Sequence, residues 1–233
     1  MKAELRRFGE SQSPVVVIDG FSGVAETIAQ MADALAPFEQ ASNFYPGVRR
    51  KITEADNPAN LYVERTCQLA AQFVGGAFDA DGFNLLEASF SIVTTAPSRL
   101  KPHQRAPHFD SVDPNYIALL HYLRVPEGTG TAFFRQKSTN IERVTADNLD
   151  LFVNTVKAEI RQLPADSGYI SGSNPLFEEV GRIEAVPDRM LMYQGSFLHS
   201  GIIPPTMPLN SDPRQGRLTA NLFIRAYRSP VHA

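Results

Sequence analysis

The chain lacks the marks of a secreted or membrane-spanning protein. Among its 233 residues there is a single cysteine, Cys67, which has no partner for an intramolecular disulfide bond. No run of about 18 consecutive apolar residues occurs, and a transmembrane helix needs that length. The first ten residues include the charged Glu4, Arg6 and Arg7, so they lack the apolar centre of a signal peptide. We therefore expect a cytoplasmic protein with no membrane partner.

An excess of basic residues is also missing. Lysine and arginine together number 22 and aspartate and glutamate 25, which gives a net charge of −3. Proteins that bind nucleic acids usually carry a basic surplus, so no nucleic-acid partner is expected. Neither an internal repeat nor a low-complexity segment is visible. The length suits one sizeable core and the composition shows no boundary, so we expect residues 1–233 to form a single domain.

The N-terminal third predicts one strand and two helices. The apolar run Val15–Ile18, ended by Asp19-Gly20, is typical of a short strand. Helical spacing of apolar residues predicts helices from Ser22, as N-cap, to Pro37, and from Asn57, as N-cap, with Pro58 in the first helical position, to the closing pair Gly75-Gly76. Between these helices, Tyr45 to Arg49 is a turn-rich stretch that suits either plain surface or a pocket rim.

From residue 83 to residue 228 the sequence is dominated by short β-like runs. They are Leu85 to Thr95, Pro107 to Val112, Tyr116 to Val125, Thr131 to Arg135, Met190 to His199 and Arg217 to Tyr227. Such runs, separated by glycine and proline turns, predict an antiparallel sandwich or barrel with the N-terminal helices against one sheet. An insertion at residues 138–186 interrupts them, with a predicted helix from Thr145, as N-cap, to Leu163.

Two separated motifs contain the candidate metal ligands. On an extended segment, His108 and Asp110 point to the same side because strand side chains alternate between faces. A distant histidine with apolar neighbours, His199, would supply a third ligand. Two histidines and one carboxylate are the ligand set of the non-haem Fe(II) oxygenases, which leaves coordination positions for a co-substrate and dioxygen. The pattern His-x-Asp is weak by itself, and the ordered set of motifs carries the prediction.

In order along the chain these motifs are His108-Phe109-Asp110, His121-Tyr122-Leu123, the glycine-rich turn at 128–133, His199 and Arg217-Leu218-Thr219. The order resembles the 2-oxoglutarate/Fe(II)-dependent dioxygenase superfamily, in particular its prolyl-hydroxylase-like branch. The resemblance implies a mainly β double-stranded β-helix, or jelly roll, with Fe(II) held by His108, Asp110 and His199. It also implies that Arg217, Thr219 and Tyr122 bind the far carboxylate of 2-oxoglutarate. Near the N-terminus, Tyr45-Pro46-Gly47-Val48-Arg49 is similar to a motif of an uncharacterised bacterial subfamily.

The reaction implied by the resemblance is hydroxylation of a small molecule or a protein side chain, with release of succinate and CO₂. Loops select the substrate in such folds, so the motifs leave its identity open. Two alternatives fit the same residues. A cupin-like jelly-roll enzyme would use the metal without 2-oxoglutarate, and a non-catalytic jelly roll would bind metal or 2-oxoglutarate without turnover.

The arginine assigned to 2-oxoglutarate has two rivals. His199 and Arg217 lie 18 positions apart, nearly twice the separation usual in the family, and a proline-rich segment at 204–213 fills the gap. Arg214 and Arg225 could therefore take the same role. Strand alternation favours Arg217, because it shares one face with Thr219 while apolar residues occupy the other. A polar face in a buried strand is explained if it binds an anionic ligand.

Overall fold

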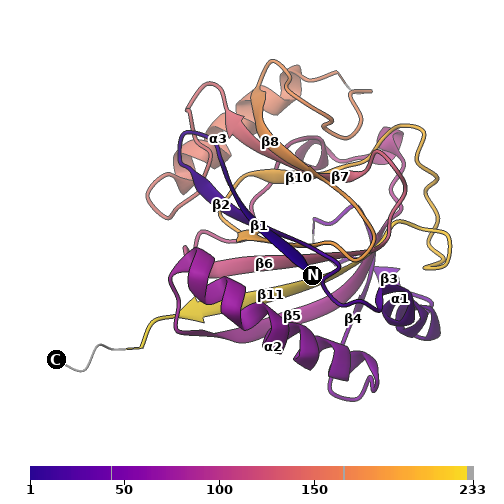
Figure 1. Ribbon diagram of the computed structural model, residues 1–233. Helices are drawn as coiled ribbons and strands as arrows, with labels where there is room; N and C mark the ends of the chain where they lie inside the picture. Colours follow the sequence, from indigo (N-terminus) through magenta and orange to yellow (C-terminus); the bar gives the residue numbers. More distant parts are fainter. Residues whose placement is uncertain (43, 165, 230–233) are drawn as a thin grey trace.

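Two antiparallel sheets dominate the computed structural model, which describes residues 1–42, 44–164 and 166–229 (Figure 1). The larger sheet has eight strands in the order β1-β2-β9-β6-β11-β5-β4-β3, and the smaller has three in the order β10-β7-β8. The strands are β1 (Lys2–Phe8), β2 (Ser13–Asp19), β3 (Glu39–Gln40), β4 (Gly47–Lys51), β5 (Gly82–Val93), β6 (Tyr116–Arg124), β7 (Gly130–Gln136), β8 (Phe177–Glu184), β9 (Met190–Gln194), β10 (His199–Ile202) and β11 (Leu218–Tyr227).

Helices cover the outer face of each sheet. The first two, α1 (Ala25–Ala34) and α2 (Ala59–Phe78), pack on the larger sheet, and α3 (Leu149–Glu159) packs on the smaller one (Figure 1). There are also short 3-10 turns, η1 (Pro97–Arg99) and η2 (Pro102–Arg105) between β5 and β6, and η3 (Ile160–Gln162) after α3. None of the helices in the described ranges is long and apolar enough to cross a membrane.

The central strand β11 shows how the larger sheet divides its two faces. Leu218, Ala220 and Leu222 are fully buried and join the core beneath α1 and α2. The alternate residues Thr219 and Asn221 therefore point to the inner face, toward the smaller sheet. Each buried leucine on the helix side contributes roughly 1.5–3 kcal/mol to stability, so the register of this strand is strongly specified.

Aromatic side chains fill part of the space between the two sheets. Phe133 of β7 stacks on Phe197 with ring centroids 4.8 Å apart, and the edge of Tyr193 from β9 packs against the same ring at 5.2 Å. Tyr122 of β6 is fully buried in this cluster. Facing antiparallel sheets around an aromatic centre, with N-terminal helices outside, confirm the mainly β jelly roll expected from the sequence.

Several N-terminal boundaries differ from the prediction. The N-cap of α1 is Val24 rather than Ser22, because the Ser22 hydroxyl donates to Asp188 in a neighbouring loop at 2.5 Å. Pro58 is the N-cap of α2, and the helix continues through Gly75-Gly76 to Phe78, where Asp79 adopts the left-handed conformation. Strands β1 and β4 were not expected. The first is an exposed edge strand, and the second lies in the stretch interpreted as a turn.

The chain after residue 100 differs from the prediction in four places. Pro107 to Val112 is not a regular strand and makes only an isolated bridge between His108 and His199. Met190 to His199 is divided at the turn around Gly195 between β9 and β10, which belong to different sheets. The insertion at 138–186 includes β8, a strand of the smaller sheet that was not predicted. Its helix α3 has Asn148 rather than Thr145 as N-cap.

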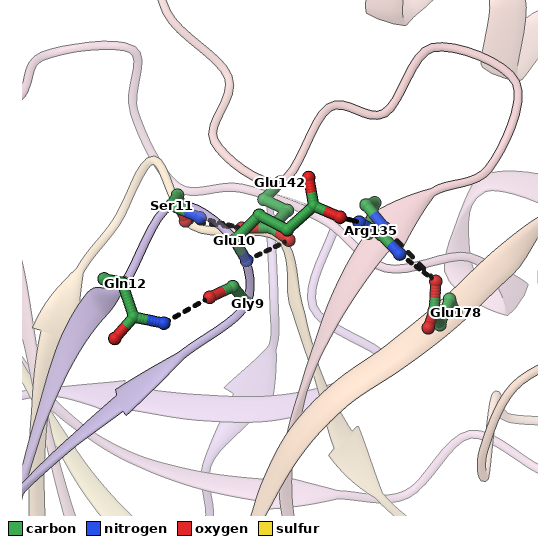
Figure 2. A network of polar contacts seen from close by, with 7 residues as sticks. All are labelled: Gly9, Glu10, Ser11, Gln12, Arg135, Glu142 and Glu178. Carbon is green, nitrogen blue, oxygen red and sulfur yellow. Dashed lines mark hydrogen bonds and ion pairs between the residues drawn. The ribbon is translucent and has the colours of Figure 1, made fainter.

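A polar network ties the β1–β2 turn to the segment after β7 (Figure 2). The buried carboxylate of Glu142 accepts the backbone N–H groups of Glu10 and Ser11 at 2.9 Å each, and the Ser11 hydroxyl donates to it at 2.5 Å. Beside it, Arg135 lies between Glu10 and Glu178 and pairs with both. The network holds the turn of the β1–β2 hairpin against the smaller sheet.

Candidate metal centre

Three side chains that could hold a metal ion, two from residues 108–110 and one from β10, meet at the inner face of the smaller sheet. Ligand atoms of His108, Asp110 and His199 all lie within 4.8 Å of one another. The His199 Nε2 is 3.5 Å from an Asp110 oxygen, and the His108 Nε2 is 4.0 Å from the other oxygen of the same carboxylate. The three side chains therefore converge as the sequence predicts, and their role as metal ligands stays a prediction.

Backbone hydrogen bonds place the three side chains. His108 and His199 exchange both of their N–H···O=C bonds, at 2.9 and 2.8 Å, which sets the two rings side by side with centroids 4.3 Å apart. The N–H of Asp110 donates to the carbonyl of Gly195 at 2.7 Å, so the turn between β9 and β10 anchors the carboxylate. His108 and Asp110 do not lie on a regular strand. The bridge to His199 and the contact with Gly195 still direct both side chains to the same side, as alternation along a strand would.

The His199 ring is oriented for metal binding. Its Nδ1 lies 2.7 Å from the carbonyl oxygen of Phe197, so Nδ1 carries the proton and the lone pair of Nε2 faces the cluster. Burial lowers the pKa of His199 to about 4. Burial, with His199 as a second cause, also lowers the pKa of His108 to about 4, although that ring opens into a pocket. Both imidazoles are therefore neutral at neutral pH, the form that binds metals.

The carboxylate of Asp110 is poorly satisfied by protein groups alone. Burial raises the pKa of Asp110, while the neighbouring His108 and then the Arg49 guanidinium oppose that rise. Its Oδ2 is buried and has no hydrogen-bond partner within the described ranges. A buried carboxylate oxygen without a partner is costly, and a divalent cation at the centre of the cluster would supply one.

A pocket of about 540 Å³ opens above the three ligands. Its polar wall comes from the inner face of the larger sheet, with Arg217, Thr219 and Asn221 along β11 and its N-terminal end. One row of paired positions crosses that sheet as Arg49, Ser91, Thr219 and Tyr122. The side chains along this row all carry polar groups, and the inner face of β11 has no aliphatic residue at this level.

Arg217 is the buried arginine of the three candidates. Its guanidinium lies over the ring of Tyr122 and donates to the Gly130 carbonyl at 3.3 Å, and its Nε has no partner among the described residues. Arg214 and Arg225 have exposed side chains, 61% and 63%, and each pairs with an aspartate outside the pocket. Of these three arginines, the geometry therefore favours Arg217 as the one that faces the pocket.

Tyr122 and Thr219 both lie next to Arg217, but their hydroxyl groups have different hydrogen-bond partners. The Tyr122 hydroxyl is buried and forms a 2.7 Å hydrogen bond with the Thr131 hydroxyl on the smaller sheet. Thr219 lines the pocket, and its hydroxyl donates to the Asn221 side chain at 2.9 Å. Their assignment to 2-oxoglutarate binding stays a prediction. Thr131 and Asn221 are additional polar groups that the sequence motifs did not single out.

Tyr45 and Arg49 also line the pocket, although the sequence left open whether they were surface or rim. The Arg49 guanidinium stacks on the Tyr45 ring at 4.6 Å and lies 5.9 Å from the centre of the Phe223 ring. The signal in the sequence was their spacing, because residues four apart on an extended segment share a face. Pro46 and Gly47 between them are typical of a turn, so the sequence did not show that this segment is extended.

The sequence comparison identifies a family through nearly the whole chain. Residues 1–224 match DUF6445, described as a family of unknown function. The chain belongs to the DUF6445 family. A comparison with curated protein sequences finds no match.

Solved structures similar to the DUF6445 chain share its fold at low sequence identity. HygX from Streptomyces hygroscopicus with iron bound is 12% identical with a TM-score of 0.52, over 93% of this chain and 83% of HygX. The non-heme alpha ketoglutarate dependent epimerase SnoN from nogalamycin biosynthesis is 15% identical with a TM-score of 0.55, over 95% and 84%. A further HygX structure contains nickel, 2-oxoglutarate and hygromycin B. The likeness confirms the jelly-roll fold implied by the sequence.

Proposed function

We propose that this DUF6445 protein is an Fe(II)- and 2-oxoglutarate-dependent dioxygenase that hydroxylates a substrate with release of succinate and CO₂. The observation that carries the proposal is the convergence of His108, Asp110 and His199 at the base of a pocket that also contains a buried arginine, Arg217. The similar structures of HygX and SnoN, which contain or depend on iron and 2-oxoglutarate, support it.

The donor set fits Fe(II). His199 presents a bare Nε2, His108 is neutral, and Asp110 contributes a carboxylate with an unsatisfied oxygen. Two neutral imidazoles and one carboxylate leave positions for further ligands on the metal. When bound, Fe(II) with 2-oxoglutarate would supply the dioxygen-dependent oxidation of a C–H bond, and the chain's own residues would bind, orient and shield the reactants.

The end of the pocket that contains Arg217 fits a carboxylate of 2-oxoglutarate. The guanidinium of Arg217 offers a planar pair of donors for a carboxylate, and the hydroxyls of Thr219 and Tyr122 lie on the neighbouring strands. Tyr122 also supports the guanidinium from beneath, which restricts its orientation. The substrate would be a small molecule or a protein side chain that reaches the metal from the pocket mouth.

The test is anaerobic titration of the protein with Fe(II) and then 2-oxoglutarate, followed by visible spectroscopy. A metal-to-ligand charge-transfer band is expected for the wild type and lost in His199→Ala, because a buried ligand is removed. His103→Ala is the matched control, since His103 lies at the pocket mouth outside the ligand cluster. A band that persists in His199→Ala would contradict the assignment of the ligands.

The same titration separates the alternatives. A cupin-like enzyme would bind Fe(II) and show no charge-transfer band with 2-oxoglutarate. A non-catalytic binding protein would form the band but release no succinate in air, with or without any substrate. Succinate release together with the band would support the proposed oxygenase.

A further inference from the structure

The segment Tyr45–Arg49 is built to direct side chains into the pocket. The carbonyl of Pro46 accepts the N–H groups of Thr94 and Thr95 at 3.2 Å each, which fastens the start of β4 to the end of β5. A Cβ at Gly47 would lie 2.0 Å from the carbonyl oxygen of Ile92, so only glycine allows this approach. The next residue, Val48, is buried against the helices. Arg49 must therefore point to the inner face.

Arg49 is a largely buried cation whose single ion pair among the described residues is a long one. Its side chain is 14% exposed, and its Nε has no hydrogen-bond partner within the described ranges. The nearest carboxylate, Glu87, is 4.0 Å away and forms a closer ion pair with Lys51 at 2.6 Å. A cation withdrawn from water in this way is costly unless an anion approaches it.

The aromatic neighbours of Arg49 hold it ready for a ligand. Stacking on Tyr45 and proximity to Phe223 restrict the guanidinium plane, so less entropy is lost when it binds a carboxylate. Arg49 and Arg217 are distinct cationic positions, because they lie on β4 and at the start of β11, with β5 between them in the sheet. If the metal and Arg217 hold the two carboxylates of 2-oxoglutarate, Arg49 is left for a different anion.

The mouth of the pocket near Arg49 carries two exposed apolar side chains. Phe44 is 76% exposed and packs edge-on against the His103 ring with centroids 4.8 Å apart. Leu86 lines the same pocket and is 50% exposed. The backbone carbonyl of Phe44 accepts a hydrogen bond from the Gln104 side chain at 3.0 Å, which holds this part of the mouth in place. Exposed apolar groups beside a cation suit an organic acid with an apolar body.

We propose that Arg49 binds a carboxylate of the substrate, while the apolar part of the same molecule lies against Phe44 and Leu86. The inference rests on the function proposed above and narrows its substrate to organic acids. The stacking on Tyr45 gives Arg49 a fixed direction, so the carboxylate would also orient the rest of the substrate toward the metal ligands.

The test uses a matched pair of probes on protein loaded with Zn(II) and 2-oxoglutarate. N-acetyl-L-phenylalanine and its amide differ only in the carboxylate, and their dissociation constants are measured by ligand-observed NMR. Wild type should bind the acid about ten- to a hundredfold more tightly than the amide, because charged hydrogen bonds to a desolvated carboxylate are strong. Arg49→Gln should lose this preference and Arg49→Lys should keep part of it, since lysine retains the charge without the planar fork.

Controls separate this inference from the proposed function. Arg214→Gln removes an exposed arginine and should behave as wild type. The affinity for 2-oxoglutarate is titrated first in every variant, and in Arg49→Gln it should stay within about twofold of wild type, which also shows that the pocket is folded. A wild type that fails to bind 2-oxoglutarate contradicts the proposed function, and the acid and amide are then compared on the Zn(II) protein alone.

Three results would overturn the inference. The first is an equal affinity, or no affinity, of the wild type for the acid and the amide. The second is an acid preference that survives in Arg49→Gln. The third is a loss of 2-oxoglutarate binding in Arg49→Gln as large as that in Arg217→Ala, which would place Arg49 in the co-substrate site. Tighter binding of phenyl phosphate than of the acid would overturn the choice of a carboxylate.

Discussion

The guanidinium carbon of Arg217 lies 5.5 Å from the centre of the Tyr122 ring, over its face. The ring supports a buried cation whose remaining donors are turned to the pocket. We expect Arg217→Ala to weaken 2-oxoglutarate binding about ten- to a hundredfold, because charged hydrogen bonds contribute roughly 1.5–3 kcal/mol. Metal affinity, measured by titration without 2-oxoglutarate, should change little.

Arg214→Ala and Arg225→Ala are the matched controls for this prediction. Both side chains are exposed and paired with aspartates outside the pocket, so 2-oxoglutarate affinity should be retained. Unchanged affinity in Arg217→Ala, with a loss in either control, would show that the pocket cation had been wrongly assigned.

Substitution of Gly47 tests the close contact between β4 and β5. Gly47→Ala places a methyl group 2.0 Å from a backbone carbonyl oxygen that cannot rotate away, so the strands must separate. We expect a loss of about 1–3 kcal/mol in the free energy of unfolding, measured by urea denaturation. Gly76→Ala is the control. It lies in α2 with no atom within 4 Å of the new methyl group, and alanine there should stabilise the helix by about 0.5–1 kcal/mol.

Asp188 predicts a dependence of stability on pH. Burial opposes its ionisation, but hydrogen bonds from His121, Ser22 and the backbone N–H of Gly23 outweigh that effect and hold the pKa of Asp188 below its usual range. A carboxyl with a depressed folded-state pKa adds stability above its unfolded value of about 3.9, and that stability is lost as the pH falls toward the folded value.

Asp188→Asn should therefore be less stable than wild type at pH 7, and the difference should shrink as the pH falls below about 4. Asparagine tolerates the φ of 64° at this position, so the backbone is not strained. Urea denaturation across the pH range measures the difference, which we expect to be about 1.5–3 kcal/mol at neutral pH. A difference that stays constant down to pH values well below 4 would rule out this role of the carboxylate.

Glu142 tests the attachment of the N-terminal hairpin. Glu142→Gln keeps the size but turns an amide toward donors that need an acceptor, so we expect a loss of about 1.5–3 kcal/mol in unfolding free energy. Hydrogen exchange of the β1 and β2 amides should rise as well, because the turn loses its anchor. Glu39→Gln, at an exposed position on an edge strand, should be neutral. Equal stability of the two variants would mean that the network does not hold the hairpin.

The chain order of the motifs predicted that His108, Asp110 and His199 converge, and strand alternation predicted the polar face of β11; the structure has both features, while metal binding stays a prediction. Alternation was informative there because one face is packed against helices, as the fully buried Leu218 and Ala220 show. A slip of one residue would expose these side chains and bury Thr219 against the helices. By the same alternation His121 faces away from the pocket, and it is buried against Tyr62 and Asp188.

Other features depend on contacts that local patterns do not contain. Strand β1 is exposed along nearly its whole length and lacks the apolar alternation by which strands are recognised. Strand β4 begins at Gly47, whose neighbour Pro46 suggests a turn, and only the approach to β5 makes the segment extended. The division between β9 and β10 follows from Gly195, where a Cβ would lie 2.6 Å from the Tyr116 ring. The contacts that decide β4 and the β9–β10 division come from residues far away in the sequence, whereas β1 is decided by pairing with its neighbour β2.

Tyrosines gather around the candidate metal centre, and this gives the protein an optical signal of its own. The chain has seven tyrosines and no tryptophan. Four of them, Tyr45, Tyr116, Tyr169 and Tyr193, line the pocket. Ultraviolet emission from the folded chain therefore comes largely from phenol rings that surround the ligand cluster. A paramagnetic ion or a coloured chelate there would quench that emission, so occupancy can be followed without attaching a dye.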